Sequence, residues 1–319
     1  DTISVSALNT LAGKTAGVVT ATATTGDTAS FSSLATDSND VITININDNP
    51  SVSALNTIAG KTAGVVTATL ASTAKADLVA LNTASTDVIT VPVSDTVSVT
   101  ELNVIAGKTG GPVTATVTTG NTASFSALAT DSNDIITINI NDNPSVTNLN
   151  TIAGKTAGVV TATLATGALS TFSALSTSGT DQITINVNDA DGVDLNATDL
   201  SALGAKTGAA VTVTEAVDIS GTTAEVTAAL VTTGSLVVVS DANVSLSDNP
   251  TISDLNDIAA KTTGVVTATL ASTAAADLAS LSTAATDVIT IPVSDTISVS
   301  ALNTLAGKTA GVVTATATT

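Results

Sequence analysis

The chain has 319 residues, a formal net charge of −19, and no Cys, His, Met, Trp, Tyr or Arg. Although 43% of the residues are hydrophobic, only three are aromatic, so the apolar content is almost all Ala, Val, Ile and Leu; this predicts a thin core repeated many times. The 27 acidic residues outnumber the 8 lysines without any basic patch, so we expect no nucleic-acid partner. Polar residues interrupt every apolar run well before the ~20 residues of a membrane span, so we expect no membrane insertion.

The first 25 residues, DTISVSALNTLAGKTAGVVTATATT, recur unchanged as residues 295–319. Variants of a marker, L-N-x-[LI]-A-G-K-T followed by G-V-V-T-A-T, recur at spacings of 47, 47, 47, 51, 55 and 47 residues, starting at Leu8, Leu55, Leu102, Leu149, Leu200, Leu255 and Leu302. Fixed periods of this size are typical of solenoids and arrays. We therefore predict one continuous solenoid over 1–319 and a longer parent chain. Its repeat units are approximately 1–47, 48–94, 95–141, 142–188, 189–247, 248–294 and a partial 295–319.

Each 47-residue unit splits into two half-repeats of 23–24 residues. In chain order, residues 3–5 are expected to be extended, and residues 6–13 to form a short helical turn with an N-cap Ser and a terminating Gly. Residues 19–24 and 42–47 alternate apolar and polar positions, which predicts strands with one buried face. The predicted fold is mainly β: a β-solenoid of about 12–13 coils, each with a strand and a short helical turn.

Equivalent positions should stack into columns if the half-repeats are coils. One predicted inward column begins Ala21, Ile44, Ala68 and Val91, in which small and large side chains alternate and can interdigitate. A string of tandem Ig-like β-sandwiches remains the alternative, because odd units resemble one another more than even ones and give a secondary period of 94 residues. The lack of a core aromatic favours the solenoid.

Two kinds of charged column are predicted. Lysines occupy one marker position (Lys14, Lys61, Lys108 and Lys155, and later Lys206, Lys261 and Lys308), and Asp37 and Asp131 occupy the equivalent place in intervening half-repeats. We interpret this Lys ladder as a charge ladder that relieves repulsion on an acidic rod, with partner docking as the alternative. Aspartates precede the strands (Asp40, Asp87, Asp134, Asp181, Asp287) and follow them (Asp48, Asp95, Asp142, Asp189, Asp248, Asp295), as expected for turn formers.

Calcium is the one cofactor that the acidic residues suggest. Asp189, Asp191 and Asp194 form the densest local cluster, around Gly192, and resemble half of an Asp-rich calcium loop without its full spacing. No other cofactor is expected.

The outward strand column is nearly all threonine. The predicted surface ladder comprises Thr20, Thr43, Thr67, Thr90, Thr114, Thr137, Thr161 and Thr184. A flat T-x-T lattice resembles the ice-binding face of solenoid antifreeze proteins, but threonine is also a common way to make the outer face of a strand polar.

The sequence predicts that the chain is not an enzyme and has no small-molecule substrate. No His, Cys or Tyr is present to act as a base, nucleophile or acid, and serine needs a base to become a nucleophile.

The phrases VSALNTIAGKTAGVVTAT, VTELNVIAGKTGGPVTAT, VITININD and ITIPVSDT resemble the repeats of giant extracellular proteins of cyanobacteria and other aquatic bacteria. Those repeats carry LNxLDxKTTGxVxAT and VTLSDT in long tandem series. The resemblance covers the whole chain and implies a calcium-associated protein of the cell surface, a sheath or a matrix. The present chain has Ala-Gly or Ala-Ala where that pattern often has Asp before Lys-Thr.

We therefore expect an extracellular or cell-surface structural protein, a fibre, sheath or layer component that assembles with itself by end-to-end stacking. An adhesin stalk, or an ice-binding module that uses the threonine ladder, is the alternative.

Overall fold

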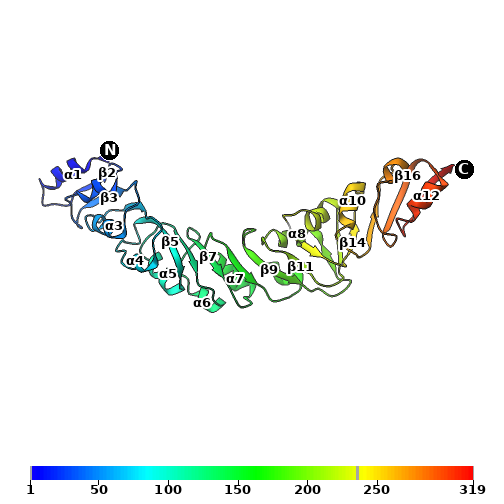
Figure 1. Cartoon of the computed structure of the whole chain (residues 1–319), viewed down its shortest axis with the longest axis horizontal. Helices are drawn as coiled ribbons and strands as arrows, with labels where there is room; N and C mark the ends of the chain where they lie inside the picture. Colours follow the sequence, from blue (N-terminus) through cyan, green and yellow to red (C-terminus); the bar gives the residue numbers. More distant parts are fainter. Residues whose placement is uncertain (1, 235–236, 319) are drawn as a thin grey trace. The chain divides into compact units, whose positions relative to one another are not determined.

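The computed structural model of the chain describes residues 2–234 and 237–318. The protein is mainly β, with short parallel strands that alternate along the chain with short helices (Figure 1). It divides into two compact units, Asp1–Asp142 with Asn148–Thr161, and Asn143–Thr147 with Ala162–Thr319. None of the described helices combines the length and the apolar character that a membrane span needs.

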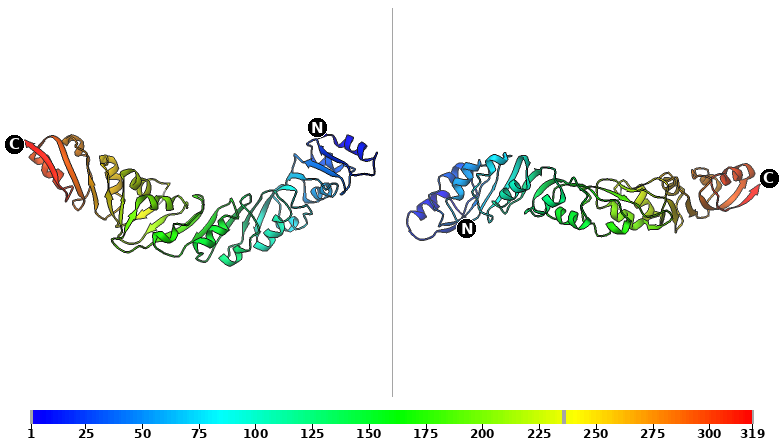
Figure 2. Two further views of the ribbon diagram at one scale, coloured as in Figure 1. Left: turned by 180° about the vertical axis from the view of Figure 1, so that it is seen from behind. Right: turned by 90° about the horizontal axis from the view of Figure 1, so that it is seen from below.

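Unit 1 is built from strands that follow one another in chain order, from blue to green in Figures 1 and 2. The strands are β1 (Thr2–Ile3), β2 (Thr20–Ala23), β3 (Val41–Asn45), β4 (Val66–Thr69), β5 (Val88–Val97), β6 (Val113–Val117), β7 (Ile135–Asn139) and β8 (Val160–Thr163), at which this unit ends. Each pairs in parallel with the next. The helices between them are α1 (Val5–Ala12), α2 (Thr28–Ser32), α3 (Val52–Ala59), α4 (Lys75–Leu78), α5 (Val99–Ala106), α6 (Thr122–Ser126) and α7 (Val146–Ala153).

Unit 2 begins with two parallel sheets between which the chain alternates. The strands are β9 (Gln182–Val187), β10 (Asp194–Asn196), β11 (Val211–Val213), β12 (Asp218–Gly221), β13 (Val237–Val239), β14 (Asn243–Leu246), β15 (Val266–Thr269), β16 (Val288–Ser298) and β17 (Val313–Thr318). They pair in the orders β9-β11-β13 and β10-β12-β14-β15-β16-β17. The helices are η1 (a 3-10 helix, Leu169–Phe172), α8 (Ala197–Gly204), α9 (Thr223–Val226), η2 (a π-helix, Thr227–Val231), α10 (Ile252–Ala259), α11 (Ala275–Leu278) and α12 (Val299–Ala306).

The helix of the first half-repeat begins earlier than predicted. Ser4, not Ser6, is the N-cap: its side-chain oxygen accepts a hydrogen bond of 3.3 Å from the backbone N–H of Ala7, and α1 therefore starts at Val5. The helix ends at Gly13, as predicted, and the segment before Ser4 pairs with β2. Strand and helical turn therefore alternate in the first half-repeat as the sequence indicates.

The core is a narrow series of aliphatic side chains. Inward strand positions such as Ile42 and Ile44 are fully buried, as are the marker leucines Leu55 and Leu102. In the intervening half-repeats either phenylalanine or leucine takes the place of the marker leucine, and Phe31 and Leu78 are both fully buried. Because all the strand pairings described above are parallel, the alternative of antiparallel Ig-like sandwiches is wrong.

The register of the strands differs from the predicted columns. Sequence equivalence pairs Ala21 with Ile44, whereas the structure pairs Ala21 with Ile42, so neighbouring strands join residues 21 apart. The next pairing, of Ile44 with Val66, joins residues 22 apart. Equivalent residues are therefore displaced by two positions from one strand to the next, which is about 6–7 Å along the strand. A displacement by two positions keeps each side chain on the same face of the sheet. The predicted inward residues Ile44, Ala68 and Val91 are therefore buried, whereas Ala21 is half-buried.

Candidate functional site

The asparagine of the marker motif joins one half-repeat to the next. The side chain of Asn56 donates to the carbonyl of Ala80 (2.7 Å) and accepts from the backbone N–H of Asn82 (2.7 Å). Asn9, Asn103 and Asn256 form the same two bonds with residues 24 and 26 positions further on. The side-chain amide thus donates and accepts one hydrogen bond each, as a backbone peptide group does, and so connects neighbouring half-repeats. We did not predict this asparagine column, although Asn follows the marker leucine in six of the seven copies.

The threonine that ends the marker joins its half-repeat to the preceding one. Thr62 is buried, and its hydroxyl accepts from the backbone N–H of Ile42 (2.7 Å) and of Gly64 (2.8 Å). It can donate to the carbonyl of Ile42 (2.9 Å). The same pattern recurs in full at Thr109, Thr156 and Thr309, and at Thr207 with Ala209 in place of the glycine. These buried bonds fix where each strand starts against its neighbour, which sets the register.

A glycine two residues after this threonine allows the close approach. A Cβ on Gly111 would lie 2.6 Å from the carbonyl oxygen of Ile89, and one on Gly158 would lie 2.5 Å from that of Ile136, both backbone atoms of the preceding strand. Gly64 and Gly311 meet the carbonyls of Ile42 and Ile289 in the same way. Only glycine fits at these four positions, because the neighbouring backbone occupies the place of a side chain. The equivalent residue after Thr207 is Ala209.

Several lysines of the Lys ladder bond to backbone carbonyls of the preceding half-repeat. The ammonium of Lys61 donates to the carbonyls of Ser32 and Leu34 (2.6 Å each), so it satisfies carbonyls at and just beyond the end of α2. Lys155 and Lys308 bond to equivalent carbonyls. Asp37 instead accepts from the backbone N–H of Asn39 (2.8 Å). The charge ladder itself stays a prediction. Lys14 is exposed, Lys108 is half-buried, and among the described residues neither ammonium forms such a bond.

The aspartates that precede the strands are buried rather than solvated. Asp87 is 5% exposed, and its two oxygens accept from the backbone N–H of Val66 in the preceding strand (2.8 Å) and of Ala84 in its own turn (2.8 Å). Asp40, Asp134 and Asp287 make the same pair of bonds. Charge-assisted bonds of this kind are stronger than neutral ones, so these carboxylates bind the half-repeats together.

The aspartates that follow the strands cap the helical turn of the preceding half-repeat. Asp142 accepts from the backbone N–H (2.9 Å) and the hydroxyl (2.6 Å) of Thr122, and the hydroxyl bond is the main reason why its pKa lies below the ordinary value. Asp48 and Asp248 bond in the same way to Thr28 and Thr223. The carboxylate at the N-terminus of a helical turn also interacts favourably with the helix dipole.

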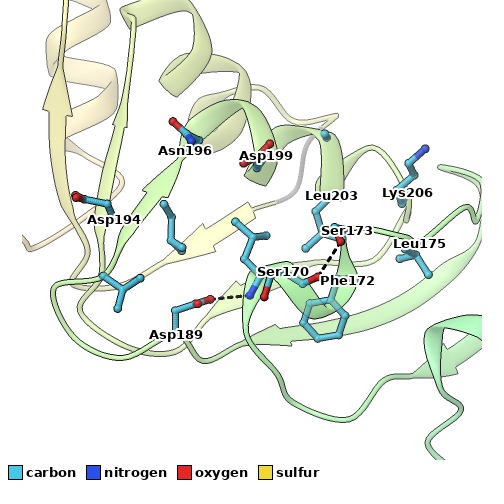
Figure 3. Close-up of a pocket in the computed structure, with 14 residues that line it drawn as sticks. Ser170, Phe172, Ser173, Leu175, Asp189, Asp194, Asn196, Asp199, Leu203 and Lys206 are labelled. Atoms are coloured by element: carbon cyan, nitrogen blue, oxygen red, sulfur yellow. Dashed lines mark hydrogen bonds between the residues drawn. The ribbon is translucent and has the colours of Figure 1, made fainter.

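The three residues of the proposed calcium loop are separately engaged. Asp189 belongs to the capping column, since it accepts from the backbone N–H of Leu169 (2.7 Å), and Asp191 accepts from the N–H of Ala216 (3.1 Å). Asp194 begins β10, and Figure 3 shows its carboxylate pointing in another direction from that of Asp189. Within 2–234 and 237–318, no group of three or more acidic side chains is arranged to hold a metal ion. The calcium site stays a prediction that this arrangement does not support.

The eight threonines of the surface ladder lie on or beside the strands with exposed or half-exposed side chains, but they do not pair with one another in sequence. The register pairs Thr20 with Val41 and Thr22 with Thr43. Further along, Thr114 pairs with Pro92 on one side and Ile135 on the other. The outer face is thus a mixture of Thr, Asn, Pro and aliphatic side chains, which interrupts a flat T-x-T lattice.

The regular pattern is interrupted by a pocket of about 490 Å³ between η1, β10 and α8 (Figure 3). A cleft of about 200 Å³ lies at the equivalent place beside α11 and α12, where Lys308 bonds to the carbonyls of Ala279 and Leu281. In the larger pocket Lys206 lines the wall, and its ammonium has no hydrogen-bond partner in the described part of the chain. Four extra residues between Leu149 and Leu200 accompany this widening. The pocket is a widened form of a cleft that the regular half-repeats keep narrow.

The asparagine, threonine and aspartate columns described here therefore form bonds between neighbouring half-repeats. Comparison of the chain with protein-family models, curated proteins and solved structures found no match.

Proposed function

We propose that the chain is a structural protein without catalytic activity, a component of an extracellular fibre, sheath or cell-surface layer. Its half-repeats stack as the coils of one continuous β-solenoid, and its partner is a further copy of itself rather than a nucleic acid, a membrane or a small-molecule substrate. Such a molecule has no single centre, because each coil supplies part of the interior of its neighbours.

The observation that carries this proposal is the recurrence of bonds between half-repeats made by the asparagine and the buried threonine of the marker motif, joined in several copies by its lysine. Asn56 reaches forward to the next half-repeat, whereas Lys61 and Thr62 reach back to the preceding one. A residue that serves catalysis is normally singular in its surroundings, whereas these side chains recur with the same bonds along the chain. The recurring chemistry supports cohesion between repeats.

The solenoid can be tested by small-angle scattering and negative-stain electron microscopy of the full chain. Twelve coils at the ~4.8 Å spacing of neighbouring strands predict a rod of roughly 60 Å per 294-residue super-period, lengthened by any tilt of the strands. Compact bodies of some ninety residues joined by hinges would contradict it.

The location can be tested by antibody labelling of the cells that make the protein. We expect labelling of intact cells or of the material around them. Labelling that appears only after permeabilisation would contradict an extracellular role, whatever the shape of the molecule.

A further inference from the structure

The pocket between η1, β10 and α8 has been enlarged by an insertion in the repeat (Figure 3). Asp189 precedes Lys206 by 17 residues, whereas the equivalent Asp295 precedes Lys308 by 13 residues. Val193, which belongs to the lengthened segment, lines the pocket. The pocket of about 490 Å³ lies in the size range of small-molecule sites, roughly 300–1,000 Å³, and the cleft of about 200 Å³ beside Lys308 lies below that range.

Asp199 in the wall of this pocket lacks the cation that its equivalent has. It occupies the repeat position of Glu101, seven residues before the marker lysine. The carboxylate of Glu101 forms an ion pair with the ammonium of Lys75 in the preceding half-repeat (3.1 Å). Leu169 stands where that repeat has Lys75, and it also lines the pocket. The exposed carboxylate of Asp199 therefore has no cationic partner in the described part of the chain.

Lys206 in the same wall lacks the acceptors that its equivalents have. Lys61 and Lys155 each donate to two backbone carbonyls of the preceding half-repeat. The equivalent carbonyls for Lys206 are those of Ser173 and Leu175, and both of these residues line the pocket. Lys206 is half-buried, and its ammonium bonds to neither carbonyl nor to any other group in residues 2–234 and 237–318. The pocket thus contains one anion and one cation whose usual partners are missing.

The two charges lie on one side of α8 and are separated by apolar surface. Asp199 and Lys206 are seven residues apart, about two helical turns, which places them on the same side and about 10 Å apart along the axis. The buried side chains of Phe172 and Leu203 also line the pocket. Figure 3 shows Lys206 at one end of the pocket and Asp194 at the other. A complementary molecule has an ammonium and a carboxylate about 10 Å apart with an apolar part between them.

We propose that this pocket binds a short extended peptide with free termini and apolar side chains. The terminal ammonium of the peptide pairs with Asp199, as the ammonium of Lys75 pairs with Glu101. Its terminal carboxylate pairs with Lys206 in place of the missing carbonyls. An extended chain spans about 3.3–3.6 Å per residue, so about three residues bridge the two charges and a single amino acid is too short. The peptide is bound without being cleaved, so this binding function is independent of the proposed structural role.

The tripeptide Leu-Ala-Trp is a suitable probe. The chain has no tryptophan or tyrosine, so the fluorescence anisotropy of the indole reports binding of the probe alone. We expect saturable binding to one site on the full chain. Acetylation of the amine or amidation of the carboxylate should each weaken binding about three- to fivefold, the upper part of the range for exposed ion pairs. The absence of saturable binding, or equal binding of the free and the doubly blocked tripeptide, would overturn the proposal.

Two charge variants test which terminus each residue binds. In Asp199→Asn the free tripeptide should bind about three- to fivefold more weakly, acetylation should have no further effect, and amidation should keep its effect. In Lys206→Gln the effects of acetylation and amidation should be exchanged. Lys108→Gln, at the same marker position outside the pocket, and Asp257→Asn, exposed on α10, are the matched controls and should bind as the unaltered chain does. An acetylation effect that persists in D199N would overturn the assignment.

A variant that fills the pocket tests the place of binding without changing a charge. Ala202 is exposed on α8 and lines the pocket, so the ring of Ala202→Phe should occupy part of the space and block the tripeptide. Circular dichroism should show that A202F keeps the secondary structure of the unaltered chain. Undiminished binding by folded A202F would show that the tripeptide is held elsewhere and overturn the proposal. Neither result changes the expected rod shape, so the structural role is tested separately.

Discussion

The buried threonine column makes a quantitative prediction for Thr109→Val. Thr109 is 7% exposed, and its hydroxyl accepts from the backbone N–H groups of Ile89 and Gly111 at 2.8 Å each. Valine has nearly the same shape, so the packing is kept while two buried N–H groups lose their acceptor. An unsatisfied buried group costs about 1–3 kcal/mol, so with two such groups we expect the free energy of unfolding to fall by about 2–6 kcal/mol in this region of the chain.

The assay should resolve local unfolding, because a repeat array need not unfold as one unit. Urea unfolding followed by circular dichroism gives the stability, and hydrogen exchange of the Ile89 amide gives the local opening. A loss of about 2 kcal/mol corresponds to roughly 30-fold faster exchange. Thr114→Val is the matched control, since Thr114 is exposed on β6 and should change stability by less than about 0.5 kcal/mol. Equal effects of the two substitutions, with Ile89 still protected, would refute the role of the buried hydroxyl.

Three further outcomes are expected. Gly111→Ala should lower the urea midpoint because its Cβ would lie 2.6 Å from the carbonyl oxygen of Ile89, whereas Gly107→Ala, whose nearest contact is 3.3 Å, should change it little; equal midpoints would contradict the close approach. The backbone N–H of Ser98 and the ammonium of Lys75 lower the pKa of Glu101 from 4.5 to about 2. Its stabilising effect is therefore complete above pH 4.5 and lost as the pH falls towards 2; melting temperatures should decline over this range, and less steeply in Glu101→Gln. Because the outer strand face is a mixture of residue types, we expect the protein to show no thermal hysteresis at micromolar concentration. Detection of thermal hysteresis would support the threonine ladder as an ice-binding surface.

The sequence predicts the local elements well because their signals are local. Alternation over residues 42–47 marks β3 and its continuation, and the terminating Gly13 marks the end of α1. The prediction of which strand face is buried is confirmed at Ile42 and Ile44, because such inward positions carry large aliphatic side chains. The register was wrong because sequence equivalence aligns repeats with one another, whereas pairing depends on side-chain bonds such as that of Thr62 with Ile42, 20 residues earlier.

The polar columns were harder to predict because residue type does not reveal the partner. Lys61 was expected to face solvent near Asp37, but backbone carbonyls that end a helical turn are nearer acceptors. Asp87 was expected to be a turn former and is also a buried acceptor. Asn56 was overlooked, although its recurrence after the marker leucine, at a position that a turn does not require, was an available signal.

The short reach of the side-chain bonds between half-repeats has a consequence for how the chain folds. Those described here join residues 20 to 29 apart, from the cap of Thr28 by Asp48 to the bond of Lys61 with Ser32. The entropic cost of closing a loop grows with the length of the segment between the contacts. Because that length is the same in each repeat, the cost per repeat does not change with the number of repeats. Folding can therefore advance along the polypeptide as it emerges, each new segment ordering on the one completed just before it, without waiting for a distant terminus.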